Sequence, residues 1–234
     1  MTYWEVLDAA THSLTLEYSF RPDSTARAFV TRFSGDELVI FSPPIGMAPA
    51  AFRELEGHGR VTALVAPNGF HYLGLRPALA AFPEATLYAP EAALRRVEKK
   101  QPDLGVRPLG ELQEKTESPV RILDVPGFSI GDTWAIVETS AGPLWYVSDS
   151  CFNLSKLPES LAARLLFKWT KSGPGLSLNG VGNLFFLKDR RRFKHWFEDR
   201  LAEPTPSLLV PAHGEIAREH ALGTSLKTLV AARL

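Results

Sequence analysis

Two histidines and one aspartate each follow an apolar segment that has the pattern of a buried strand. His71, Asp149 and His213 come directly after, or within a few residues of, these segments. If the three strands end at one edge of a sheet, the two imidazoles and the carboxylate converge there. Such a set suffices to hold a zinc ion with an open fourth position, where bound water reaches a pKa of ~7. The apolar segments cover 61–66, 144–148 and 207–210.

Three polar residues beside these candidate ligands are predicted to contact a substrate. Asn68 could offer an amide oxygen, whereas Tyr72 and Ser150 could donate hydrogen bonds. Each also has a simpler interpretation. Asn68 stands between Pro67 and Gly69 and is typical of a turn, Tyr72 of core packing and Ser150 of the end of a strand.

Strand and helix patterns alternate over much of the chain and favour an α/β fold. Residues 34–37 separate two alternating apolar segments and predict a hairpin, and helices are predicted after most of the strands that follow. Polar residues 101–119 are predicted to form a connection, and a second group of strands and helices comes after them. The predicted strands are 14–20, 28–33, 38–42, 61–66, 86–89, 121–125, 133–139, 144–148 and 207–210, and the predicted helices are 48–56, 75–82, 91–100, 157–167 and 189–201.

The order of these elements and motifs resembles the metallo-β-lactamase superfamily. Gly127 belongs to the pattern, and the most specific pieces are Ser148-Asp149, the run from Pro211 to Gly214 and the spacing between them. The resemblance covers nearly the whole chain and implies a four-layer αββα sandwich of two similar halves. We therefore expect residues 1–234 to form a single domain of this type.

The chain departs from that family at most of its metal-binding positions. The signature H-x-H-x-D-H falls on residues 66–71, so that Ala66, Asn68 and Phe70 replace ligands and only His71 remains. The mid-chain histidine of the family falls on Phe128. The resemblance thus implies that one of two metal sites is lost, and that the other keeps three of its four ligands.

Two functional hypotheses follow. In the first, His71, Asp149 and His213 hold one zinc ion that activates water for hydrolysis of an ester, amide or phosphoester, with Asp149 at the catalytic centre. In the second, the chain is a non-catalytic ligand-binding or interaction module without metal, and the three residues form a hydrogen-bonded cluster. Phe70 and Phe128 would then fill the vacated volume and exclude water from it.

The bulk composition excludes several classes of partner. The 26 basic and 26 acidic residues balance, which argues against a nucleic-acid-binding surface. No segment approaches the ~20 consecutive apolar residues that span a bilayer, and the first residues lack the pattern of a signal peptide. We therefore expect a cytoplasmic protein whose partner is a small-molecule substrate or ligand. The oligomeric state stays open, because Trp4, Trp134 and Trp169 suit either an interface or a core.

Three further features have both a functional and a structural interpretation. The single cysteine, Cys151, excludes an internal disulfide; it could be a nucleophile, but free cysteines are more often small buried apolar residues. The glycine-rich segment 173–182 is interpreted as a flexible lid. The basic helix around Arg190 is interpreted as a solvated face, with Phe193, Trp196 and Phe197 packed inward.

Overall fold

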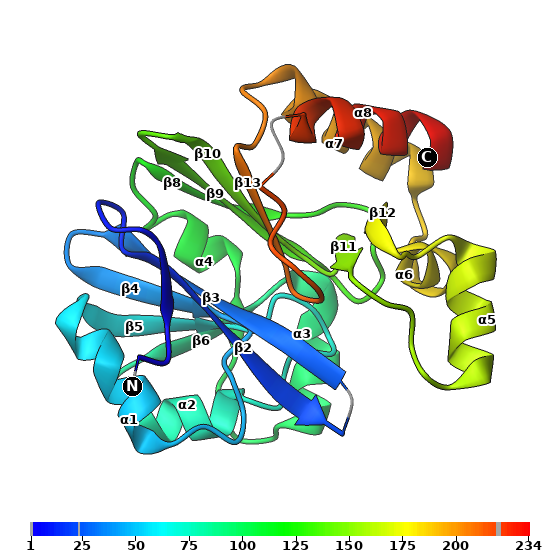
Figure 1. Cartoon of the computed structure of the whole chain (residues 1–234). Helices are drawn as coiled ribbons and strands as arrows, with labels where there is room; N and C mark the ends of the chain where they lie inside the picture. The colour runs from blue at the N-terminus through cyan, green and yellow to red at the C-terminus, as the bar shows by residue number, and fades with distance from the viewer. Residues whose placement is uncertain (1, 23, 219–220) are drawn as a thin grey trace.

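The computed structural model describes residues 2–22, 24–218 and 221–234 and contains two main β-sheets (Figure 1). The first sheet has seven strands in chain order, with β1 to β4 antiparallel and β4 to β7 parallel. The predicted hairpin is confirmed, since β3 pairs with β4 around the 35–36 turn. The strands are β1 (Glu5–Asp8), β2 (Ser13–Arg21), β3 (Ser24–Ser34), β4 (Glu37–Phe41), β5 (Arg60–Val65), β6 (Thr86–Ala89) and β7 (Arg107–Pro108).

The second sheet has four strands in the order β13-β10-β9-β8, and β10 and β13 run parallel. A two-stranded ribbon, β11-β12, lies beside it. The ribbon corrects the prediction of a flexible lid over 173–182, because residues 175–178 of that segment form a strand. The strands are β8 (Val120–Asp124), β9 (Thr133–Thr139), β10 (Gly142–Ser148), β11 (Cys151–Leu154), β12 (Gly175–Leu178) and β13 (Leu208–Pro211).

Helices cover the outer faces of both sheets, with α1 to α3 on the first and α7 and α8 on the second (Figure 1). Pro90 and Asp189 directly precede α3 and α7, and the Asp189 side chain accepts a hydrogen bond from the backbone N–H of Arg192. The helices are α1 (Pro49–Arg53), the 3₁₀ turn η1 (Glu54–Gly57), α2 (Leu75–Ala81), α3 (Glu91–Lys100), α4 (Gly110–Gln113), α5 (Leu161–Thr170), α6 (Gly180–Phe186), α7 (Arg190–Ala202) and α8 (Leu222–Arg233).

Three apolar cores separate the four layers. One lies between the first sheet and its helices, one between the two sheets, and one between the second sheet and α7 and α8. The central core stacks Tyr146 on Phe29, with ring centroids 5.2 Å apart. The layering confirms the predicted αββα sandwich.

Residues 101–119 are more than a connection. Leu109 and Leu112, the latter on the short helix α4, are buried in the central core between the sheets. The prediction was wrong here because two leucines in a polar stretch carry too weak a periodic signal. The two halves of the chain are therefore joined by a segment that contributes to the core.

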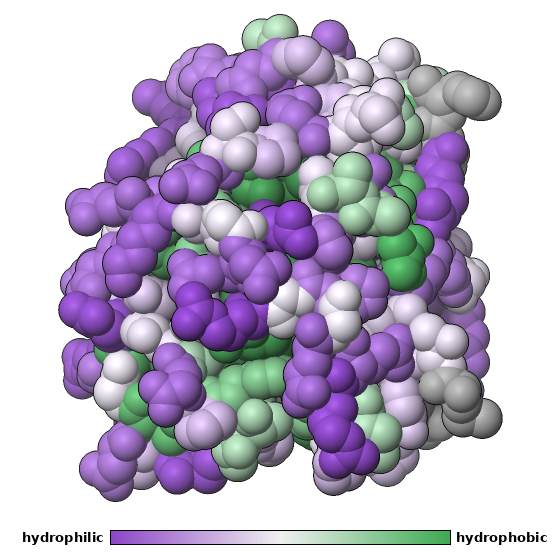
Figure 2. Space-filling model, turned by 90° about the vertical axis from the view of Figure 1, so that its left-hand side faces the viewer, coloured by the Kyte–Doolittle hydropathy of each residue, from purple (hydrophilic) through white to green (hydrophobic). Residues whose placement is uncertain are grey.

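The tryptophans divide between core and surface. Trp4 and Trp134 are buried, whereas Trp169 on α5 is 69% exposed. On α7, Phe193 and Phe197 are buried as predicted, and Trp196 is partly buried against the same core. The face in Figure 2 is mostly hydrophilic, with hydrophobic side chains in small separate areas. In the part of the chain that the structure describes, every helix is too short or too polar to cross a membrane.

Candidate metal centre

His71 lies in the loop between β5 and α2, and its ring is held at both nitrogens. The loop is fixed to the rest of the protein by a hydrogen bond from the Gly69 N–H to the carbonyl oxygen of Ile130. His71 Nδ1 lies 2.5 Å from Ser42 Oγ, and Nε2 lies 3.2 Å from Asp149 Oδ2. Ser42 follows β4, the neighbour of β5, so that parallel strand ends place the serine and the histidine together.

Asp149 follows β10 at a local irregularity of the second sheet. The register between β10 and β13 shifts between Tyr146 and Ser148, and Ser148 has a φ of 45°. A bulge followed by a left-handed residue turns the chain sharply. The turn presents the Asp149 carboxylate to the loops of the first sheet instead of continuing the ladder.

His213 follows β13, the parallel neighbour of β10. Its Nδ1 lies 2.7 Å from the carbonyl oxygen of Thr25, and its Nε2 lies 3.3 Å from Asp149 Oδ1. Gly214 fixes the loop behind it, since it has a φ of 95° and a Cβ there would lie 2.2 Å from the carbonyl oxygen of Asn153. The backbone thus requires glycine directly after the histidine.

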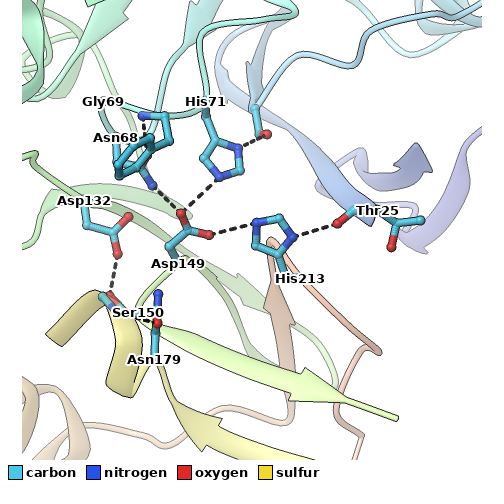
Figure 3. Close-up of polar contacts among 12 residues, drawn as sticks. Thr25, Asn68, Gly69, His71, Asp132, Asp149, Ser150, Asn179 and His213 are labelled. Atoms are coloured by element: carbon cyan, nitrogen blue, oxygen red, sulfur yellow. Dashed lines mark hydrogen bonds and ion pairs between the residues drawn. The ribbon is translucent and has the colours of Figure 1, made fainter. Parts of the chain in front are cut away.

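The three predicted ligands meet at one point, as Figure 3 shows. One ligand atom from each of His71, Asp149 and His213 can be chosen so that all three lie within 4.8 Å of one another. Tetrahedral zinc with bonds of ~2.0–2.1 Å separates its ligand atoms by roughly 3.4 Å. His71 Nε2 lies 3.2 Å from Asp149 Oδ2 and His213 Nε2 lies 3.3 Å from Oδ1, and each distance is close to that separation.

The donor set favours a cation between His213 and Asp149. Because the Thr25 carbonyl can only accept, His213 Nδ1 carries a proton and donates it. In a neutral imidazole, Nε2 then presents a lone pair to the carboxylate, which also only accepts. Within the described residues, Asp149 Oδ1 has no hydrogen-bond donor of good geometry. A proton or a metal ion is needed to make this contact attractive.

The charges of the three groups are coupled. Burial opposes ionisation of Asp149 and by itself would raise its pKa. The positive charge and the hydrogen bond of His71 outweigh this effect, with smaller contributions from His213 and Asn68, so the pKa of Asp149 lies well below its usual range. Burial also lowers the pKa of His213, and Asp149 only partly offsets that effect. For His71, burial is outweighed by Asp149 and the pKa is raised. Without metal, a proton therefore resides preferentially on His71.

A second buried carboxylate, Asp132, was not predicted. Its Oδ2 accepts a 2.6 Å hydrogen bond from Ser150, whose hydroxyl accepts one from Trp134 Nε1 at 3.0 Å. Burial, followed by the negative charge of Asp149, raises the pKa of Asp132 to about 7. The available signal was its position directly before β9. Since β9 runs antiparallel to β10, its start lies beside the end of β10.

The predicted substrate contacts occupy three different environments. Asn68 is buried and donates from Nδ2 to Asp149 Oδ2 at 2.9 Å, while its Oδ1 accepts from the backbone N–H of Phe70. Ser150 is also buried and its hydroxyl is engaged with Asp132, which corrects the expectation that it faces a substrate. Tyr72 lines an open cavity beside His71. Its contact with a substrate stays a prediction.

Two cavities flank the Asp149 carboxylate. One, of about 800 Å³ including its open mouth, also borders His71, His213 and Tyr72. The other, of about 530 Å³ including its open mouth, borders Asn68 and Asp132. Phe70 and Phe128 line this second cavity and do not fill it, contrary to the expectation for a chain without metal.

Cys151 does not take part in the site. It is fully buried on β11 within the core under α7 and α8. Burial, with a smaller effect of Asp132, raises the pKa of its thiol well above the usual range. A thiolate is the nucleophilic form of cysteine, so these surroundings favour the structural interpretation.

No protein-family model matches the sequence, and no curated protein matches it in sequence. Solved structures do match over nearly the full length. A putative diflavin flavoprotein A 5 fragment from Nostoc sp. PCC 7120 has a TM-score of 0.62 at 14% identity, covering 98% of this chain and 96% of that one. The DIM-1 metallo-β-lactamase has a TM-score of 0.61 at 11% identity, covering 99% and 97%.

A third similar structure is the flavodiiron core of Flv1 from Synechocystis sp. PCC6803, with a TM-score of 0.57 at 13% identity. The match covers 94% of this chain and 59% of that one. Identities this low establish the fold alone. The chain has the metallo-β-lactamase fold, with its His-Asp-His cluster at the edge where strand ends from both sheets meet.

Proposed function

We propose that this chain is a hydrolase with a single metal ion, held by His71 Nε2, His213 Nε2 and the carboxylate of Asp149. The observation that carries the proposal is the contact between His213 Nε2 and Asp149 Oδ1, at 3.3 Å, in which two acceptor atoms face each other. Bound zinc would supply a fourth coordination position, where water loses a proton near neutral pH. We retain zinc as the expected ion because its ligand preferences include imidazole and carboxylate.

The chain's own residues would orient the ligands. Thr25 holds His213 by Nδ1, and Ser42 contacts Nδ1 of His71, so that both Nε2 atoms are directed to Asp149. Such partners fix ring orientation and tautomer and raise ligand basicity. Asn68 holds the second carboxylate oxygen, which restricts rotation of Asp149.

Substrate would enter through the cavity shared by Tyr72, His71 and His213. We assign Tyr72 as a hydrogen-bond donor to substrate, because it lines this cavity while Asn68 and Ser150 are engaged within the protein. The substrate is a small molecule with an ester, amide or phosphoester bond. We also propose that residues 1–234 act as one domain in the cytoplasm.

The alternative is a ligand-binding module without metal. It is supported by the hydrogen bond from Asn68 to Asp149, because an amide donor there satisfies part of the carboxylate's requirement for positive partners. The two hypotheses make different predictions for added zinc. Only the metal-dependent hydrolase requires zinc to raise the stability of the protein strongly, and requires that increase to depend on His71 and His213.

Thermal unfolding of protein freed of metal by a chelator, with and without zinc, tests the proposal. Zinc at a hundredfold excess over its Kd stabilises the folded state by ~2.7 kcal/mol, which raises Tm by about 5–10 °C for a chain of this size. His71→Ala and His213→Ala should each abolish the increase. His195→Ala is the matched control, since that side chain is 77% exposed on α7.

Hydrolysis of p-nitrophenyl acetate and bis-p-nitrophenyl phosphate gives the second readout. The proposal expects zinc-dependent turnover of at least one class that disappears in His71→Ala and persists in His195→Ala. An equal Tm in the presence and absence of zinc, together with no turnover above background, would exclude the metal-dependent hydrolase and leave the binding module.

A further inference from the structure

The cavity on the Asn68 side of Asp149 is walled by aromatic side chains from five segments of the chain. Its enclosed volume is about 140 Å³, close to that of an engineered cavity of ~150 Å³ that binds benzene, so it suits one small aromatic group. We call it the aromatic pocket. Its aromatic members are Phe70, Phe128, Phe152, Phe167 and Phe186.

The walls are held by contacts between these rings. Phe70 meets Phe186 edge to face with centroids 5.2 Å apart, and Phe152 stacks on Phe167 at 6.2 Å with an angle of 7° between the planes. Phe70 lines both cavities and is 39% exposed, although the Arg96 guanidinium lies 4.3 Å from its ring centroid. A flat apolar group would bury this exposed surface and gain stacking contacts.

The opposite side of the aromatic pocket carries hydrogen-bond acceptors. Asp132 and Asp149 both belong to its lining, and Asp132 is only 2% exposed. Asp132 Oδ2 accepts from Ser150, whereas Oδ1 has no hydrogen bond of good geometry among residues 2–22, 24–218 and 221–234, although the Ser148 and Asn68 side chains lie near enough to lower the pKa of this carboxyl. A buried acceptor without a well-formed hydrogen bond lowers stability, so a ligand that donates to it recovers free energy.

Charge restricts the ligand further. In the described part of the chain, Lys and Arg are missing from the lining of the aromatic pocket, while two carboxylates are present. An anionic group would therefore be repelled there. A neutral or cationic group with an N–H or O–H fits both the walls and the acceptors.

We propose that the aromatic pocket binds a flat aromatic group that carries an N–H or O–H donor, and that the donor is bound by Asp132. Because Asp149 lines both cavities, a ligand seated here extends to the His-Asp-His cluster. If the bound aromatic group is part of the substrate, the inference rests on the proposed function. Binding itself requires no metal.

Calorimetric titration of chelator-treated protein with indole and with benzofuran tests the proposal. The two probes have nearly the same shape, and only indole carries an N–H donor. We expect indole to bind at least tenfold more tightly than benzofuran. At about pH 8, above the pKa of about 7 of Asp132, Asp132→Asn should reduce that preference to less than threefold, because an amide oxygen is a weaker acceptor than a carboxylate.

Neighbouring phenylalanines on α6 provide a matched pair for the walls. Phe186→Ala should weaken indole binding about tenfold, as expected for loss of an aromatic contact and its buried area. Phe185→Ala should change it less than twofold, since Phe185 is exposed and lies outside the lining. Val181→Trp fills the pocket without removing apolar surface and should abolish binding. Circular dichroism confirms that each variant is folded.

Equal affinities for indole and benzofuran would overturn the assignment to Asp132, and equal effects of the two phenylalanine variants would overturn the assignment to the pocket. Both results are independent of zinc. Indole binding without zinc binding contradicts only the proposed hydrolase, and zinc binding without indole binding contradicts only the aromatic pocket.

Discussion

Replacing Asp132 by asparagine should change the pH dependence of stability in a defined direction. Burial raises the pKa of Asp132 from 3.8 to about 7 in the folded protein. The folded state thus binds this proton more tightly than the unfolded state does. The free energy of unfolding must therefore fall as pH rises between these two values.

The size of the effect follows from the two pKa values. A tenfold change in proton affinity is worth about 1.4 kcal/mol, so a rise from 3.8 to about 7 corresponds to about 4 kcal/mol. An asparagine side chain at this position carries no charge and can still accept the hydrogen bond from Ser150. Between about pH 4 and pH 8, Asp132→Asn should therefore gain about 4 kcal/mol relative to the wild type.

Urea denaturation of chelator-treated protein at about pH 4.5 and about pH 8 measures this difference. With an m-value of about 2–3 kcal/mol/M, the midpoint of the variant relative to the wild type should shift by roughly 1–2 M between the two conditions. Asp199→Asn, an exposed control on α7, should show no such change. A difference between Asp132→Asn and wild type that stays constant within ~0.5 kcal/mol at both pH values would refute the reasoning.

Three further predictions concern the fold. Tyr146→Phe should change stability by less than ~1 kcal/mol in urea denaturation, because the Tyr146 hydroxyl is buried and its contact with the Ser148 side chain lacks good hydrogen-bond geometry; a loss above ~1 kcal/mol would show that the hydroxyl is bonded. Gly214→Ala should cost ~1–3 kcal/mol by thermal unfolding, since the added Cβ would lie 2.2 Å from the Asn153 carbonyl, and an unchanged Tm would contradict that geometry. Phe197→Ala should lower the free energy of unfolding by ~3–5 kcal/mol, because Phe197 is 0% exposed. Trp169→Ala should lower it by less than ~0.5 kcal/mol, because Trp169 is 69% exposed, and similar losses for the two variants would contradict this difference in burial.

The three candidate ligands could be predicted because they follow strands with strong apolar patterns. Parallel pairing of β10 with β13 then brings Asp149 and His213 to one edge. Local sequence was also sufficient to predict the β3–β4 hairpin and strand β6. The observed bounds of β6 equal the predicted ones. In these places the local pattern and the tertiary contacts agree.

Other features depend on contacts between distant segments. The pairing of β11 with β12 joins residues about 25 positions apart, and glycine and serine in β12 give it the composition of a loop. Asp132 cannot be predicted from the ends of strands, because it precedes β9, and the antiparallel pairing of β9 with β10 brings the start of β9 to the site. The aromatic pocket collects side chains from five segments, which a linear pattern does not connect.

The central claim is that His71, Asp149 and His213 hold one metal ion, and the metal content of the purified protein tests it most directly. Elemental mass spectrometry of protein purified without chelator and then dialysed against zinc should find about one equivalent per chain. The same measurement on Asp149→Asn should find less than about a tenth of an equivalent. Less than a tenth of any transition metal in the wild type, or a full equivalent in Asp149→Asn, would contradict the claim.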